Sequence, residues 1–109
     1  MTLQDLHTAK VSIQVSAPAG TNIIIPAQTD AWIYIHELVG DMTAGGTLVI
    51  ECGSRVQGVF TLDAGQGLTQ QDEPGMDGVP RFMCRPGENF VLKPTGGTFQ
   101  GSCDYSLRY

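Results

Sequence analysis

The chain ends in the stretch TFQGSCDYSLRY, residues 98–109, which alternates between apolar and polar residues more regularly than any other part of the sequence. Successive side chains of a β-strand face opposite sides of its sheet, so this pattern predicts a long strand with one buried face. The residues expected on that face are Phe99, Gly101, Cys103, Tyr105, Leu107 and Tyr109. Because a single strand cannot bury its own apolar face, we expect it to lie between neighbouring strands.

The rest of the chain repeats this pattern in shorter segments, each bounded by glycine or proline. With the last strand they make about eight strands, as in an all-β, single-domain antiparallel sandwich or a small barrel. We divide the chain into an N-terminal arm, residues 1–8, and a β-sandwich domain, residues 9–109, and expect residues 63–80 to be irregular. The remaining strands are expected at residues 11–16, 22–25, 31–39, 47–52, 55–62, 81–84 and 89–93.

Composition limits the function. Charged residues make up 16% of the chain and the net charge is −5, with six scattered Lys and Arg residues. Nucleic-acid binding needs clustered basic residues, so we expect no nucleic-acid partner. No apolar run approaches the ~20 residues of a membrane span, and the first residues lack the pattern of a secretory signal. We therefore expect no membrane partner, and synthesis in a cytoplasm.

The three cysteines, Cys52, Cys84 and Cys103, cannot all pair within one chain. A cytoplasmic protein usually keeps its thiols reduced, and these spacings match no zinc module. Cys103 falls on the apolar face of the last strand, where a thiol behaves as a small hydrophobic group. We expect all three to be buried free thiols.

The residues that carry common enzyme chemistry are sparse. The histidines are His7, in the arm, and His36, which we expect on a strand surface rather than as a metal ligand. A Ser-His-Asp set can be assembled, but the sequence has no Gly-x-Ser-x-Gly elbow to present the serine. No phosphate-binding loop or dinucleotide fingerprint occurs. We expect a protein without enzymatic activity and without a cofactor.

Two further features have alternative interpretations. The acidic stretch Asp72-Glu73-Pro74-Gly75-Met76-Asp77 could supply oxygen ligands to Ca²⁺, but an exposed acidic loop explains it as well, and we expect no metal. Trp32 and Tyr34 are an i, i+2 pair on one face of a strand, about 7 Å apart. We expect them to pack in the core; the alternative is a platform on which a sugar stacks.

Several segments follow one another in an order that resembles a known family. They are Ile23-Ile24-Ile25-Pro26-Ala27, Trp32-Ile33-Tyr34-Ile35-His36-Glu37-Leu38, Gly46-Thr47-Leu48-Val49-Ile50, Gly58-Val59-Phe60-Thr61-Leu62 and Arg85-Pro86-Gly87-Glu88-Asn89-Phe90-Val91-Leu92, before the closing strand. In this order the chain resembles the capsid decoration, or cement, proteins of tailed bacteriophages, which are small β-sandwiches of the jelly-roll type.

The resemblance implies a structural protein of the virion that binds the outer surface of a phage head and stabilises capsid subunit contacts. Its partners would be the major capsid protein and further copies of itself, as a dimer or trimer. The alternative is a carbohydrate- or receptor-binding module of a phage tail. We expect partner contacts from Thr2, Leu3 and Leu6 in the arm and from Asp72, Glu73 and Asp77 in the acidic loop; in the alternative module, Trp32 and Tyr34 would contact the ligand.

Overall fold

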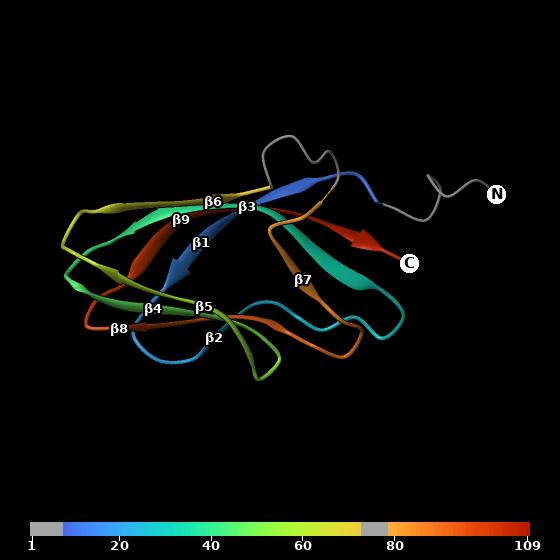
Figure 1. Ribbon diagram of the computed structural model, residues 1–109, viewed down its shortest axis with the longest axis horizontal. Helices are drawn as coiled ribbons and strands as arrows, with labels where there is room; N and C mark the ends of the chain where they lie inside the picture. Colours follow the sequence, from blue (N-terminus) through green and yellow to red (C-terminus); the bar gives the residue numbers. More distant parts are fainter. Residues whose placement is uncertain (1–7, 73–78) are drawn as a thin grey trace.

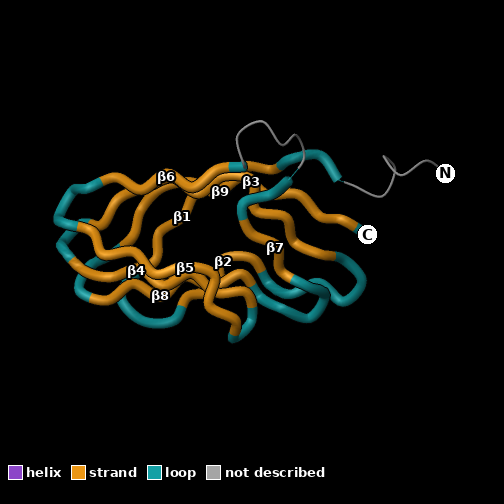
Figure 2. The backbone as a smooth tube through the Cα atoms, in the orientation of Figure 1, coloured by secondary structure: helices purple, strands orange, loops and turns teal. Residues whose placement is uncertain are grey.

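A computed structural model describes residues 8–72 and 79–109, and in this part of the chain it confirms an all-β antiparallel sandwich. Two sheets pack face to face, one above the other in Figure 1 and Figure 2. The strands are β1 (Val11–Ala17), β2 (Asn22–Ile25), β3 (Trp32–Met42), β4 (Gly46–Cys52), β5 (Arg55–Leu62), β6 (Gly67–Gln71), β7 (Phe82–Cys84), β8 (Phe90–Thr95) and β9 (Phe99–Arg108).

The strand order is that of a jelly roll. Sheet A has the order β1-β9-β3-β6, with β7 paired to β3 as a fifth strand, and sheet B has the order β2-β8-β4-β5. Consecutive strands mostly alternate between the two sheets, and the β4–β5 hairpin turns through the two residues Gly53 and Ser54. This interleaving of two four-stranded sheets defines the jelly roll, to which this chain adds β7.

The last strand lies in the centre of sheet A, as its alternation predicted. β9 pairs with β1 on one side and with β3 on the other over almost its whole length. Phe99 and Cys103 are fully buried between the sheets. The prediction was wrong at Tyr109, which is exposed because the strand ends at Arg108 and no neighbour pairs beyond it.

Two boundaries differ from the prediction. β6 (Gly67–Gln71) lies inside the stretch expected to be irregular. The sequence did not indicate this strand, because Leu68 is its single buried apolar residue and one residue gives no alternating pattern. β3 continues past the expected end at Val39 to Met42, since Gly40 pairs directly with Gly101 of β9. A Cβ atom on either glycine would collide with backbone of the opposite strand. Glycine therefore extends this strand instead of ending it.

The prediction of three free thiols was wrong. Cys52 at the end of β4 and Cys84 at the end of β7 form a disulfide, with 5.0 Å between their Cα atoms. Each cysteine is the last residue of a strand in a different sheet, so the bond joins sheet B to sheet A. Cys103 is free and buried, as predicted, and burial raises the pKa of its thiol to about 12.

An ion pair joins the β4–β5 hairpin to the segment between β7 and β8, close in sequence to the two disulfide cysteines. Arg55, at the start of β5, donates hydrogen bonds of 2.8 and 2.7 Å to the two carboxylate oxygens of Glu88, in the turn between β7 and β8. The backbone N–H of Arg85 donates a third, of 2.8 Å. These hydrogen bonds favour the charged carboxylate, and they lower the pKa of Glu88 to about 2.

This pair predicts a specific loss of stability in acid. The folded-state pKa of Glu88 lies below its ordinary value of 4.5, so its contribution is present above that pH and is lost as the pH falls towards about 2. We expect Glu88→Gln to melt below the wild type at neutral pH, with a difference that shrinks between about pH 4.5 and pH 2. Thermal unfolding followed by circular dichroism measures it. A difference that stays constant across this range would contradict the assignment.

Candidate functional site

The outer face of sheet A holds a polar pocket, and an irregularity in β3 creates it. Ile35 pairs with Tyr105 and Glu37 with Asp104, so His36 between them is the extra residue of a β-bulge. On the other edge of β3, the neighbouring strand changes from β6 to β7 at the same place. The backbone N–H of Asp72, after β6, donates to the carbonyl oxygen of His36, and the N–H of Arg81, before β7, donates to the carbonyl oxygen of Ile35. The bulge therefore lies where β6 ends and β7 takes over.

The imidazole of His36 is buried among polar partners, which corrects the prediction of a surface residue. Its Nδ1 lies 3.1 and 3.2 Å from the two carboxylate oxygens of Asp72, and its Nε2 lies 2.8 Å from the hydroxyl of Ser106. The edge of the ring also meets Tyr34, with 6.4 Å between ring centroids. Because both ring nitrogens have partners, the side chain is buried at little cost.

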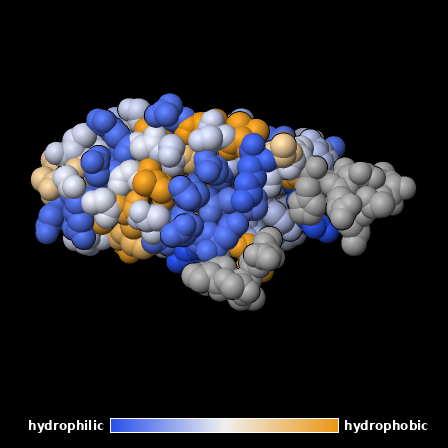
Figure 3. Space-filling model, turned by 90° about the horizontal axis from the view of Figure 1, so that it is seen from above, coloured by the Kyte–Doolittle hydropathy of each residue, from blue (hydrophilic) through white to orange (hydrophobic). Residues whose placement is uncertain are grey.

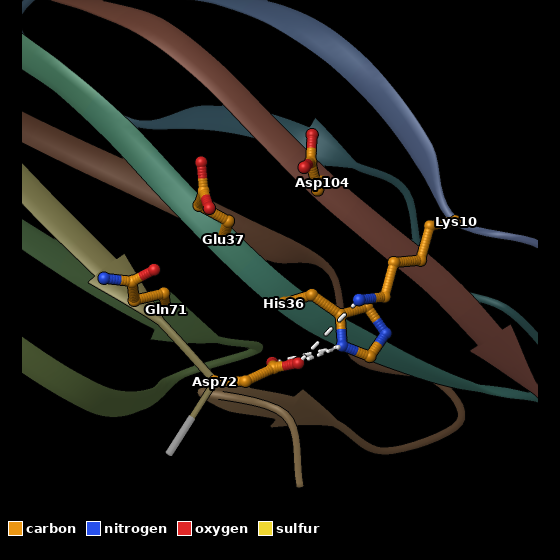
Figure 4. A pocket seen from close by; sticks show the side chains of 6 residues that line it. All are labelled: Lys10, His36, Glu37, Gln71, Asp72 and Asp104. Atoms are coloured by element: carbon orange, nitrogen blue, oxygen red, sulfur yellow. Dashed lines mark hydrogen bonds and ion pairs between the residues drawn. The ribbon is translucent and has the colours of Figure 1, made fainter. Parts of the chain in front are cut away.

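Figure 4 shows how the pocket is built around this ring. Its volume is about 220 Å³. Lys10 reaches over His36 and places its Nζ 3.9 Å from Asp72, while the side chains of Glu37 and Asp104 point away from that pair. The pocket is lined by Lys10, His36, Glu37, Gln71, Asp72 and Asp104.

The order Asp72, His36, Ser106 has the hydrogen-bond distances of a catalytic relay, but its surroundings favour a structural role. A nucleophile must be open to its substrate. Ser106 is 5% exposed and is not one of the described residues that line the pocket. We interpret the three side chains as a network that fixes the bulge and fastens the end of β6 to β3 and β9.

The rest of this outer face is mostly polar, and Figure 3 views it from above. Residues that pair directly across a sheet lie on the same face, so the register gives its composition. A second hollow, of about 490 Å³, lies farther along the same sheet. The rows from the bulge onward are Ser12-Asp104-Glu37-Gln71, Gln14-Ser102-Val39-Thr69 and Ser16-Gln100-Asp41-Gly67.

Trp32 and Tyr34 lie on the same outer face of sheet A, but before the bulge along β3, whereas these rows come after it. The prediction that the two aromatic side chains pack in the core was wrong. Ile33 and Ile35 face the core instead and are fully buried. Trp32 is 38% exposed, and Tyr34 pairs with Met83 of β7, which is 41% exposed. The beginning of β3 therefore presents an aromatic and apolar platform to solvent.

The outer face of sheet B is different: half of its residues are aliphatic, and it carries no net charge. Ile23, Val56 and Val59 are more than half exposed. Its two charges, Lys93 and Glu51, form an ion pair with 3.0 Å between Nζ and Oε1. Three rows of directly paired residues make up this face: Ile23-Val91-Glu51-Val56, Lys93-Val49-Val59 and Thr95-Thr47-Thr61.

The structure brings together some of the predicted contact residues and leaves others outside its description. Trp32 and Tyr34 share one face, and Asp72 belongs to the pocket beside them. Thr2, Leu3, Leu6, Glu73 and Asp77 lie outside the described residues. Sequence reasoning missed the face of sheet B, because β5 has apolar residues on both sides and its pattern alone does not tell which side is buried.

Over residues 8–72 and 79–109, no helix is long and apolar enough to span a membrane, and no group of three or more His, Cys, Asp or Glu side chains is placed to hold a metal ion. No family model, curated protein or solved structure matches this chain.

Proposed function

We propose that the chain is a non-catalytic structural protein of a bacteriophage virion. It binds the outer surface of the head and stabilises contacts between subunits of the major capsid protein. The observation that supports this most is the outer face of sheet B, where exposed apolar side chains gather on a four-stranded surface. Contiguous apolar patches on small proteins commonly mark sites of protein–protein interaction.

The electrostatics of this face suit a permanent contact. Burying an unpaired charge at an interface is costly, whereas Lys93 and Glu51 neutralise each other before any partner arrives. The remaining side chains of the three rows are aliphatic or threonine, which pack against a partner without loss of charge hydration. Many copies on a symmetric shell would multiply such modest contacts through high effective concentration.

The disulfide between Cys52 and Cys84 agrees with this proposal. Disulfides persist in oxidising surroundings, which an exposed virion protein meets after the host cell opens. A dimer or trimer belongs to the same proposal, because β1 and β5 are edge strands without charged residues from Val11 to Ala17 and from Val56 to Leu62. Uncharged edges readily pair with a strand of another copy. The arm, residues 1–8, would extend these contacts.

Co-sedimentation with empty heads tests the proposal, using heads assembled from the major capsid protein of the proposed phage. We expect the wild type to sediment with the heads and Val56→Glu/Val59→Glu to bind on the order of tenfold more weakly, since two carboxylates would enter an apolar contact. The matched control, Gln14→Glu/Gln100→Glu, adds the same charge to sheet A and should bind normally. Absence of wild-type binding, or equal loss in both variants, would refute the assignment.

A further inference from the structure

We propose that the outer face of sheet A binds a neutral oligosaccharide. This surface is separate from the face of sheet B, so the two activities do not compete. The inference stands on three observations: an exposed aromatic platform, a continuous polar track beside it, and the sign of the charges along that track.

The platform lies where β3 begins. Trp32 is 38% exposed, and Met83 is exposed beside Tyr34, its direct partner across β3 and β7. A pyranose ring has an apolar face of C–H groups, which stacks on an aromatic or thioether surface. Trp32 and Tyr34 stand about 7 Å apart on this face, which is wide enough for one sugar ring to cover part of both.

The polar track begins at the His36 pocket and continues into the second hollow. Its side chains are chiefly planar carboxylates and amides, and each can pair with two neighbouring hydroxyl groups at once. Such a combination of an apolar platform with convergent polar groups is typical of ligand sites. The residues that supply these groups are Glu37, Gln71 and Asp104 in the pocket, and Gln14, Ser16, Asp41 and Gln100 in the hollow.

The dimensions favour a chain of sugars over a single one. Trp32 and Asp41 lie on the same strand, and β-strands advance about 3.3 Å per residue, so the platform and the track together are roughly 30 Å long. The two hollows lie along its length. An extended oligosaccharide can stack at the platform and hydrogen-bond along both hollows.

The charges of the track select against an acidic glycan. Four carboxylates line the two hollows, at Glu37, Asp41, Asp72 and Asp104, and they outnumber the two cations of this face, Lys10 in the pocket and Arg108, which pairs with Trp32 beside the platform. They would repel sulfated, phosphorylated or sialylated chains, but they accept hydrogen bonds from neutral hydroxyls. The ligand is therefore of the neutral class.

The experiment uses an array of immobilised neutral and acidic glycans, probed with the purified chain. The strongest neutral hits are then titrated in solution. Trp32 is the only tryptophan of the chain, so its fluorescence reports directly on the platform. We expect a saturable change in emission with neutral oligosaccharides, longer chains binding more tightly than disaccharides, and weaker binding of acidic ones.

Two variants test the residues by calorimetric titration. Trp32→Ala and Glu37→Ala should each weaken binding on the order of tenfold, whereas Val59→Ala, an exposed residue of sheet B, should not change it. Thermal melting verifies that each variant is folded, and both sheet A variants should still sediment with phage heads. Absence of neutral hits, unchanged binding by Trp32→Ala, or a preference for acidic or cationic ligands would overturn the proposal.

Discussion

Reduction of the Cys52–Cys84 disulfide is expected to lower the free energy of unfolding by about 3–4 kcal/mol. The two cysteines are 32 positions apart. In the chain-entropy description, a bond across a loop of this length restricts the unfolded chain, so breaking it favours unfolding. At a few degrees per kcal/mol for a domain of this size, the melting temperature should fall by roughly 15 °C.

Thermal and urea unfolding with and without a phosphine reductant measure this effect. The double variant Cys52→Ala/Cys84→Ala is the control: it should melt near the reduced wild type and should not respond to the reductant. Cys103, which is buried and free, should stay inaccessible to thiol reagents until the chain unfolds. Equal melting of the oxidised and reduced wild type would contradict a stabilising bond between the sheets.

Truncation of Phe99 is expected to be at least as damaging. Its ring is fully buried at the start of β9, and its Cζ lies 2.7 Å from where a Cβ of Gly40 would stand. The ring therefore fills space that exists because residue 40 has no side chain. Phe99→Ala leaves that space empty and should cost about 3–5 kcal/mol of unfolding free energy.

Denaturant unfolding of Phe99→Ala compared with Tyr109→Ala measures this prediction. Tyr109 is also an aromatic residue of the C-terminal stretch, but it is exposed beyond the end of β9, so its removal should change the stability by less than about 0.5 kcal/mol. Similar losses for the two variants would mean that the packing around Phe99 has been misjudged.

The contrast between these two aromatic residues shows where the alternating pattern predicts burial correctly and where it does not. Alternation assigned Phe99 and Tyr109 to the same face, and the assignment holds only where a neighbouring strand pairs. A short strand with one apolar residue, β6, has too little pattern to be recognised. The strand was expected to end before Gly40, whereas the pairing of Gly40 with Gly101 keeps β3 extended.

The candidate sites could be predicted even less well than the strands from the local sequence pattern. Trp32 and Tyr34 were recognised as a pair, but their expected burial was wrong because β3 has apolar residues on both faces and the other sheet covers only one. His36 was expected on a strand surface. Its burial could not be predicted, because Asp72 and Ser106 are 36 and 70 positions away.

By itself the sequence determined the class of this protein: an antiparallel β-sandwich whose last strand is buried on one face. That information is local, because the two-residue period of a strand and the stops at glycine and proline act within a few residues. Only the tertiary structure decided that Cys52 meets Cys84, that His36 is enclosed, and that one outer face is mostly polar while the other exposes a group of aliphatic side chains. Those outcomes depend on the register between strands that are far apart in the chain and on how the two sheets pack.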